Sequence, residues 1–261
     1  MSFHALANND VHLWFLPEGV ADIERLCAAS MDLLMPDELQ RYQSFRNSGR
    51  AKQFLLGRIL LRHSLAAHLA ADVNALQFSY GPNGKPELPK TIIDGLVFSL
   101  SHARSRAVVA IASGERIGVD LEMSNRAESA LGIARQFFTV AENQQLESRG
   151  EAASQEAMAL WGLKESIVKA SGDTIWSGLS EVQLALGGEQ IQWRSAPPDG
   201  PASNWFLMSG RYKDECMIAL AVQRKQRIFQ EQKICSHVLG HESANDNPVR
   251  ISLASNPVST K

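Results

Sequence analysis

The sequence predicts an α+β fold made of two similar lobes. Each half of the chain reads as a strand, then helices, then further strands, which is the first observation behind this fold class. The second is that apolar residues recur at helical spacing in residues 54–69 and 128–171, while shorter runs typical of strands lie around them. We therefore expect an N-terminal lobe over residues 1–114, a C-terminal lobe over residues 115–225, and a polar, mobile tail over residues 226–261.

In the first half, residues 11–16 form an apolar run that predicts an opening strand. Pro36, followed by two acidic residues, is typical of the first turn of a helix. The apolar residues of 54–69 suit a helix of about five turns that buries one side. Residues 76–80 alternate as a strand does, and the glycines and prolines of residues 81–86 predict a turn after it.

In the second half, the helical block over residues 128–171 should be broken near Phe138 and Gly150. Thr139, with Glu142 three residues later, forms a capping-box pattern, so a helix should begin there. Strands are expected at residues 96–100, 107–112, 117–122, 181–186, 191–194, 205–208 and 217–222.

The composition is that of an ordinary globular protein, because 44% of the 261 residues are hydrophobic and 21% are charged. A formal net charge of −2 gives no basic field for nucleic acid, so any phosphate site must be local. The apolar runs are too short for a membrane span, and the first residues lack the pattern of a secretory signal. Three irregularly spaced cysteines do not suggest a disulfide framework. We expect a cytoplasmic monomer that binds neither nucleic acid nor membrane.

Two carboxylates, Asp120 and Glu122, lie two residues apart in the strand expected at residues 117–122. Alternate side chains of a strand share a face, so both acids should face one way while Val119 and Leu121 enter the core. Carboxylates this close repel one another unless a cation lies between them, and magnesium prefers such oxygen ligands. The alternative is a solvated strand face, but unpaired acids in a buried strand are unfavourable, which favours the metal site.

Glu165 and Lys169 lie four residues apart on the expected helix and share a face, with Trp161 one turn earlier. The simple interpretation is a helix-stabilising ion pair that contributes about 0.2–0.5 kcal/mol. The functional interpretation is that Glu165 adds a third carboxylate to the metal site and that Lys169 meets a diphosphate. Lys164 should point elsewhere, toward solvent.

Groups that can hold a phosphate are also present. Ser101 and His102 follow an apolar strand, where they could bind a phosphate, or could form a capped strand end with a packed histidine. Gly84 and Lys85 lie in a stiff turn that lacks the spacing of a Walker loop. Arg41, on an early helix, is either a further phosphate contact or a solvated helix residue.

Together these residues resemble the motifs of the 4′-phosphopantetheinyl transferases of the surfactin-synthetase-activating (Sfp) type. Order and spacing agree across residues 36–222, and five motifs in one order are far more specific than any one of them. The five motifs are 84–86 (GKP), 98–102 (FSLSH), 117–122 (IGVDLE), 137–139 (FFT) with Glu142, and 161–169 (WGLKESIVK). The segment 54–58 (FLLGR) also fits.

The resemblance implies a magnesium-dependent transfer of 4′-phosphopantetheine from coenzyme A to a serine of an apo acyl or peptidyl carrier protein. Adenosine 3′,5′-bisphosphate would be the second product. The resemblance also implies two α/β lobes related by pseudo-twofold symmetry, with the active site at the lobe interface and the metal and catalytic residues in the C-terminal lobe. The choice of carrier protein stays open.

By resemblance, Asp120, Glu122 and Glu165 are the magnesium ligands, and Lys169 contacts the phosphates of coenzyme A. Glu165 and Lys169 are the expected catalytic residues. Glu165 would remove the serine proton, either directly or through a metal-bound water.

The remaining matches concern coenzyme A. The residues that the resemblance places near it are Arg41, Gly84, Lys85, Ser101, His102 and Lys169. One position departs from the family, because Glu38 stands where some members carry a second basic residue. A compensating charge could then come from Arg46, Arg50 or Lys52.

Two other functions use the same residues. A magnesium-dependent nucleotide hydrolase or nucleotidyl transferase would need the acids but no protein acceptor. A non-catalytic carrier-binding module would not need them, so the presence of all three acids and Lys169 argues against it. Separately, Cys235, His237 and His241 are spaced as in some zinc sites, but three ligands in a polar tail without a cysteine pair do not predict one.

Overall fold

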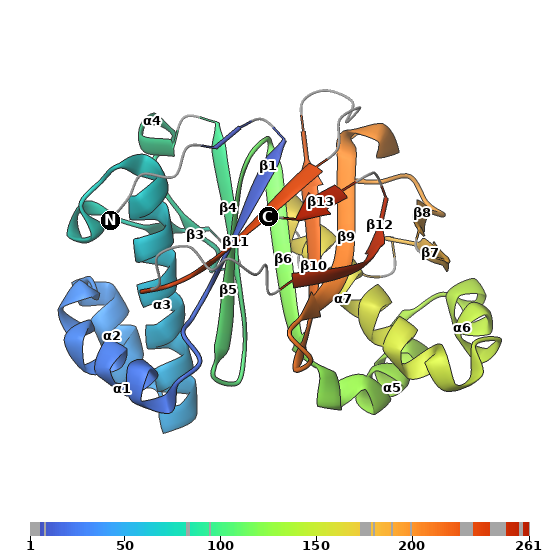
Figure 1. Ribbon diagram of the computed structural model, residues 1–261, viewed down its shortest axis with the longest axis horizontal. Coiled ribbons are helices and arrows are strands. Elements are labelled where there is room, and N and C mark those ends of the chain that lie inside the picture. The colour runs from blue at the N-terminus through green and yellow to red at the C-terminus, as the bar shows by residue number, and fades with distance from the viewer. Residues whose placement is uncertain are drawn as a thin grey trace.

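The structure, a computed structural model, contains two β-sheets that pack face to face, with helices on the outer side of each (Figure 1). It describes residues 6–7, 9–81, 84–93, 95–172, 179, 181–188, 190–198, 200–224, 232–240, 249–255 and 258–260. Among these residues, no helix is both long and apolar enough to cross a membrane. The mixed α+β class and the two-part organisation agree with the sequence.

The first sheet has five strands in the order β13-β11-β1-β5-β4. Their bounds are β1 (Asp10–Phe15), β4 (Leu96–Ala103), β5 (Arg106–Ser113), β11 (Gln232–Val238) and β13 (Val258–Thr260). β1 is central: it pairs antiparallel with β5 and parallel with β11. The opening strand predicted from the sequence therefore lies in the middle of this sheet.

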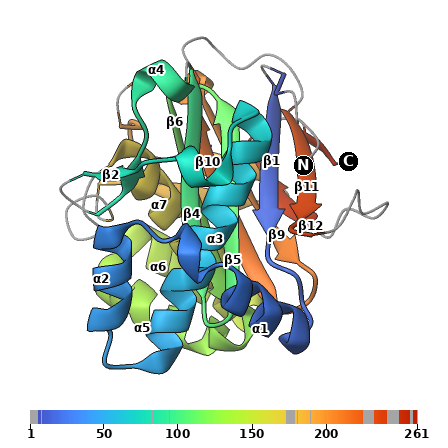
Figure 2. The same ribbon diagram turned by 90° about the vertical axis from the view of Figure 1, so that its left-hand side faces the viewer.

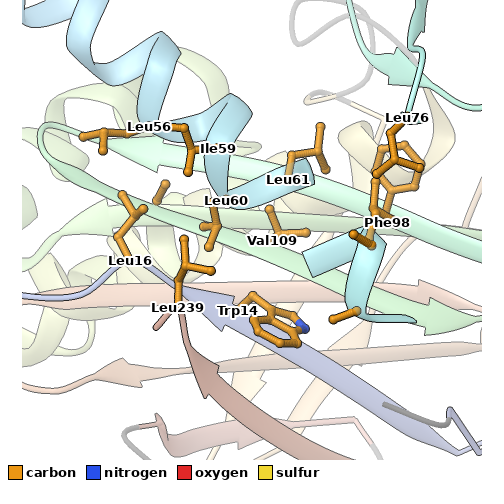
Figure 3. Packing of buried hydrophobic residues seen from close by; sticks show 14 of the residues in the cluster. Trp14, Leu16, Leu56, Ile59, Leu60, Leu61, Leu76, Phe98, Val109 and Leu239 are labelled. Carbon is orange, nitrogen blue, oxygen red and sulfur yellow. The ribbon is translucent and has the colours of Figure 1, made fainter. Parts of the chain in front are cut away.

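Helices cover the outer face of the first sheet, as seen from the side in Figure 2. They are α1 (Val20–Ala29), α2 (Pro36–Ser44), α3 (Ser48–Leu69) and α4 (Lys90–Ile93), and a small hairpin of β2 (Ser79–Tyr80) and β3 (Pro86–Glu87) lies beside them. α3 supplies most of the packing, and Figure 3 shows Leu60 among Leu16, Val109 and Leu239. α2 begins at Pro36 as predicted, whereas α1 was not anticipated.

The second sheet has six strands in the order β6-β10-β9-β12-β8-β7. Their bounds are β6 (Arg116–Met123), β7 (Leu184–Gly187), β8 (Gln190–Trp193), β9 (Trp205–Tyr212), β10 (Cys216–Gln223) and β12 (Val249–Ala254). Its outer face carries α5 (Ala127–Phe137), α6 (Val140–Glu147) and α7 (Ala153–Ser171).

Short 3₁₀ turns lie at η1 (Met31–Leu33), η2 (Val73–Ala75), η3 (Ser124–Arg126), η4 (Gly150–Ala152) and η5 (Ala202–Asn204). The helical block breaks where the sequence indicated, and Thr139 caps α6 with the predicted capping box.

The alternation of β6 fixes which side chains reach the site. Val119 and Leu121 are buried in the core between the two sheets. Asp120 and Glu122 point to the opposite face, which α7 covers, as period-2 alternation requires. The strand and the division of its faces are therefore as predicted.

One predicted strand is shorter than expected. Residues 76–80 alternate in sequence, but only Ser79–Tyr80 pair as a strand. Leu76 is buried, and its carbonyl accepts a hydrogen bond of 2.5 Å from the guanidinium of Arg62 on α3. The carbonyl of Leu76 is thus directed toward α3, and residues 76–78 take no part in a described ladder.

The expectation of an unstructured polar tail over residues 226–261 is wrong for the part that the structure describes. β11, β12 and β13 all lie there, and each takes a place in one of the two sheets. Ile234 and Val249 are buried in the core between the sheets. Polar side chains dominate this segment because its strands alternate and only one of their faces enters the core.

Lys164 is also placed differently from the prediction. It is fully buried, and its ammonium lies 2.9 Å from a carboxylate oxygen of Glu142 and 3.1 Å from the carbonyl oxygen of Leu179. Burial lowers the pKa of Lys164, and Glu142 opposes that fall. Glu142 also accepts from the backbone of Thr139 and of Leu184, so this carboxylate joins α6, α7 and β7.

We predict that Glu142→Ala lowers the free energy of unfolding by about 3–5 kcal/mol, because it leaves the Lys164 charge buried without its partner. Urea unfolding measures the change. Glu147→Ala, at an exposed position of the same helix, is the matched control and should stay within about 0.5 kcal/mol of the parent. Equal effects of the two substitutions would contradict the structural role of Glu142.

We also predict that Ile234→Ala destabilises the protein by about 2–5 kcal/mol, since it would open a cavity between the two sheets. Thermal and urea unfolding both report this loss. Ser252→Ala, at an exposed position of β12, should have little effect. If Ile234→Ala were as harmless as the control, the C-terminal strands would not be part of the stable fold.

Candidate active site

The site depends on an unusually close contact between α7 and β6. Gly118 of β6 faces α7, and a Cβ there would collide with the carbonyl oxygen of Ser166 and press on the backbone of Ala170. Gly162 of α7 faces Ala219 and Asp120, and a Cβ there would lie 3.1 Å from the Cβ of Ala219. Glycine at both positions lets the helix backbone lie directly on the sheet. This contact brings Asp120 of β6 close to Glu165 and Lys169 of α7.

Those residues are the predicted acids and lysine. The ammonium of Lys169 lies 2.5 Å from Oδ1 of Asp120 and 3.3 Å from Oε2 of Glu165. The Glu165–Lys169 pair is therefore more than a helix-stabilising contact, because Lys169 also bridges to a strand of the sheet. Lys169 supplies the positive charge between the two carboxylates in this structure.

Glu122 is held from two sides. Its Oε1 accepts a hydrogen bond of 3.3 Å from the indole N–H of Trp161, and its Oε2 lies 3.5 Å from the guanidinium of Arg126. Trp161 in turn lies against Phe137 of α5, with ring centroids 6.3 Å apart. The helix that carries Glu165 thus also orients Glu122.

Crowding of carboxylates changes their protonation. Burial and the charge of Asp120 raise the pKa of Glu165 to about 7, although Lys169 opposes the rise. Burial and Asp120 also raise the pKa of Glu122 above its usual value, against Arg126 and the hydrogen bond from Trp161. Burial alone would lower the pKa of Lys169, but Asp120 and Glu165 outweigh it and raise the pKa, so this ammonium stays charged. The cluster has an excess of negative charge that one lysine does not balance.

These residues suit a magnesium ion. Asp120 is only 3% exposed, yet its Oδ2 is a buried oxygen without a hydrogen-bond partner among the described residues. A buried, unpaired carboxylate oxygen is unfavourable unless a cation or water meets it. Asp120, Glu122 and Glu165 offer hard oxygen ligands of the kind that magnesium prefers. The donor set therefore fits the predicted metal.

Serine hydroxyls of β4 join this cluster to the first sheet. Oγ of Ser101 accepts from the backbone N–H of Leu121 and donates to Oδ1 of Asp120, both at 3.2 Å, and Lys169 donates to it as well. Ser99 accepts in the same way from the N–H of Val119. The single hydrogen of the Ser101 hydroxyl is thus used on Asp120. Ser101 thus positions that carboxylate, and its expected contact with a phosphate stays a prediction.

A cavity of about 560 Å³ opens over this cluster. Its lining brings together six of the predicted residues, namely Ser101, His102, Asp120, Glu122, Glu165 and Lys169. His102 is exposed at the rim. The lining draws on α3 and β4 in one half of the chain and on β6 and α7 in the other.

Three predicted residues are not part of this lining as described. Arg41 is exposed on α2, with its guanidinium 5.4 Å from the ring centre of Phe54. Gly84 has a φ of 73°, a left-handed conformation that favours glycine in this turn. Lys85 donates a hydrogen bond of 2.9 Å to the carbonyl of Lys169, which ties the turn to the end of α7, and burial lowers the pKa of Lys85.

Glu38, the position that departs from the family, is almost fully buried and has a structural role. Its carboxylate accepts hydrogen bonds from Arg62 at 2.5 Å, from the hydroxyl of Tyr80 at 2.8 Å and from the backbone of Met35 at 3.0 Å. Burial would raise the pKa of Glu38, but Arg62 and Met35 outweigh it and lower the pKa. This carboxylate is engaged inside the first lobe and does not line the cavity, and compensation by Arg46, Arg50 or Lys52 stays a prediction.

Three polar lining residues were not among the predicted site residues: Gln53, Arg104 and Arg126. Each lies next to a motif rather than inside it, immediately before the FLLGR segment, shortly after FSLSH and shortly after IGVDLE. Polar residues beside a motif were the only signal available. The two arginines add positive charge to the lining, and Arg126 lies 3.5 Å from the carboxylate of Glu122.

Comparison with known proteins agrees with this geometry. The family described as "4′-phosphopantetheinyl transferase superfamily" matches residues 116–216, and "4′-phosphopantetheinyl transferase, N-terminal" matches residues 23–114. These two segments contain every predicted site residue.

Individual phosphopantetheinyl transferases are also similar to this chain over much of its length. The 4′-phosphopantetheinyl transferase HetI of Nostoc sp. is 31% identical, over 83% of this chain and 89% of its own length. The 4′-phosphopantetheinyl transferase psf-1 of Bacillus pumilus is 32% identical, over 58% of this chain and 66% of its own. The L-aminoadipate-semialdehyde dehydrogenase-phosphopantetheinyl transferase of Mus musculus is 25% identical, over 80% and 66%. The chain therefore belongs to the 4′-phosphopantetheinyl transferase superfamily, as an Sfp-type enzyme that transfers 4′-phosphopantetheine from coenzyme A to carrier proteins.

Proposed function

We propose that the cavity between β4, β6 and α7 is where this transfer takes place. The observation that carries the proposal is that Lys169 lies between Asp120 and Glu165 on the floor of a cavity large enough for part of coenzyme A. The acceptor is a serine hydroxyl of an apo acyl or peptidyl carrier protein, and adenosine 3′,5′-bisphosphate is the other product. The serine oxygen attacks the phosphorus that bears pantetheine, and the bond to the bisphosphate breaks.

We propose Asp120, Glu122 and Glu165 as the ligands of a magnesium ion. Magnesium bound there supplies positive charge that neutralises the diphosphate of coenzyme A. The chain prepares this place: Ser101 fixes Asp120, Trp161 fixes Glu122, and Gly162 lets α7 bring Glu165 close to both. Carboxylates oriented in advance lose little conformational freedom when they bind a ligand.

Lys169 is proposed to contact the phosphates of coenzyme A. Its ammonium is charged, lines the cavity, and is carried on a flexible stem. His102, Arg104 and Arg126 line the same cavity and add hydrogen-bond donors there. Gln53 is a neutral donor there. Contacts from Arg41, Gly84 and Lys85 to the adenosine part stay predictions.

Glu165 is proposed as the group that takes the serine proton. Burial beside Asp120 raises the pKa of Glu165 to about 7 in the metal-free protein, and a bound magnesium ion would lower it, so that the carboxylate would be ready to accept a proton. Glu165 lines the cavity, so a serine that enters can meet it. Asp120 is less suited, because Lys169 and Ser101 already engage its Oδ1.

We also propose that the two lobes are related by pseudo-twofold symmetry, with the active site at their interface. Each lobe has a short helix whose third residue is a buried glutamate that accepts a hydrogen bond from the N-cap backbone, Glu38 in α2 and Glu142 in α6. Each glutamate pairs with a buried base on the long helix of its lobe, Arg62 or Lys164. The cavity is lined from both lobes, which supports the interface as the site.

Two alternative functions are a nucleotide hydrolase, which uses the same acids, and a non-catalytic binding module. One assay separates both from the proposed transfer. The protein is incubated with coenzyme A, magnesium and an apo carrier protein, and the intact mass of the carrier is measured. The proposal requires a gain of one phosphopantetheine that is absent when a chelator is added. Cleavage of coenzyme A with an unchanged carrier would instead indicate a hydrolase, and coenzyme A binding without any cleavage would indicate a binding module.

We predict that Glu165→Gln reduces turnover by about 10²–10⁴-fold, the range for loss of a general base, while coenzyme A affinity changes little. Carrier mass against time gives turnover, and calorimetry gives affinity. Glu156→Gln, on the same helix but paired with Arg149 away from the cavity, should keep full turnover. Normal turnover of Glu165→Gln would remove Glu165 from the chemistry.

We predict that magnesium binds more tightly as pH rises from 6 to 8. Below a pKa of about 7, Glu165 holds a proton in the metal-free protein, and magnesium must displace it. Affinity should therefore fall by about tenfold per pH unit below that pKa and level off above it. Glu156→Gln should keep this profile, whereas Glu165→Gln should flatten it. An affinity independent of pH in the parent protein would contradict Glu165 as a ligand.

A further inference from the structure

A second group of metal-ligating side chains lies on the outer face of the first sheet, away from the cavity. β1 and β11 run parallel, and their register places Asp10 opposite Lys233, His12 opposite Cys235 and Trp14 opposite His237. Alternate residues of a strand share a face. Trp14 packs in the core under α3, so Asp10, His12, Cys235 and His237 lie on that face too.

Three of these residues are close enough to share one ion. Asp10, His12 and Cys235 each offer one ligand atom, and these atoms all lie within 4.8 Å of one another. Asp10 and His12 are 7% and 5% exposed, and Cys235 is half-buried. The ligand atoms of a tetrahedral zinc site are about 3.4–3.6 Å apart at ordinary bond lengths, so a contraction of about 1 Å closes the site.

His237 and the neighbouring rings hold His12 in place. Nε2 of His237 lies 3.0 Å from Nδ1 of His12, and the two rings are stacked with centroids 4.9 Å apart. His68 of α3 contacts the His12 ring edge-on at 4.7 Å. Nδ1 of His12 faces His237, whereas Nε2 lies 3.9 Å from Oδ2 of Asp10, so we assign Nε2 to the ion. A metal-bound histidine usually donates its second ring N–H to an acceptor, and Nε2 of His237 can take that role here.

We propose that Asp10, His12 and Cys235 bind a zinc ion, with His237 fixing the orientation of His12. A mixed nitrogen, oxygen and sulfur donor set is typical of zinc and unsuitable for magnesium. The zinc–sulfur bond replaces the S–H bond of Cys235, and the proton leaves to solvent. Asp10 and the thiolate balance the charge of the ion, and one tetrahedral position stays open. The spacing Cys235, His237, His241 concealed this site, because two of its ligands come from the start of the chain and His241 lies outside the described residues.

The ion would join the two ends of the described chain. His12 and His237 are 225 positions apart, and β11 is attached to the first sheet through β1. Zinc should therefore strengthen the attachment of the C-terminal strands. The carboxylates of the proposed magnesium site lie on β6 and α7, so the two sites can be tested separately.

The test uses the full chain after chelator treatment, with zinc binding measured by competition with a coloured chelator and cobalt used as a spectroscopic probe. We expect one zinc per chain and a thiolate-to-cobalt absorption band. Cys235→Ser should abolish that band and weaken zinc binding by at least about 100-fold, beyond the 10–100-fold typical of losing an outer-shell partner. Cys27→Ser, which removes a half-buried thiol on α1, is the matched control and should bind as the parent does.

Two further measurements keep the test decisive. If Cys235→Ser does not fold, alkylation of the parent followed by mass spectrometry replaces it, and zinc should protect Cys235 but not Cys27. Asp120→Asn should leave zinc binding and the cobalt band intact, because its carboxylate belongs to the other site. The proposal is overturned if the band is absent, if zinc leaves Cys235 unprotected, or if Asp120→Asn removes zinc binding.

Discussion

The close contact between α7 and β6 is the constraint on which the site depends. Gly118 and Gly162 remove the two side chains that would hold the helix away from the sheet. Helices and sheets usually pack through interlocking side chains, which would separate Glu165 and Lys169 from Asp120 by several ångströms more. Here the backbones meet, so acids from a strand and a helix share one lysine. The electrostatic crowding that raises the pKa of Glu165 follows from this contact.

The second constraint is the seam between the two sheets. β4 and β6 are edge strands of different sheets, and their edges are joined by Ser99 and Ser101 hydroxyls. The hydroxyls satisfy backbone N–H groups of β6 that an unpaired edge would leave exposed. Asp120 lies between the two residues held in this way. Its position is therefore determined by both sheets, and a change in the packing of either would move it.

Much of this arrangement was predictable because it is local. The period of α7 places Glu165 and Lys169 on one face. The alternation of β6 separates Asp120 and Glu122 from Val119. The capping box of α6 can be recognised from residues 139–142 alone.

What the sequence could not show are pairings between distant segments. Lys164 looks like any surface lysine until Glu142 is found beside it, and the sequence does not show that the hydroxyl of Ser101 donates to Asp120. The C-terminal strands were not predicted for a related reason. Strands that bury only one face keep many polar residues, so the segment looked like a mobile tail. A motif reports residue type and spacing, and the partner that decides a side chain's role lies elsewhere in the chain.

The order of strands has a consequence for synthesis on the ribosome. β11 lies between β1 and β13 in the first sheet, and β12 lies between β9 and β8 in the second. Both sheets therefore need residues 232–260 to be complete. The hairpin of β7 and β8 cannot join its sheet before β12 has been synthesised. Domains usually fold one after another as they emerge. In this protein neither lobe can be completed before residues 232–260 have been synthesised, so the nascent chain must remain partly open, and accessible to chaperones, until then.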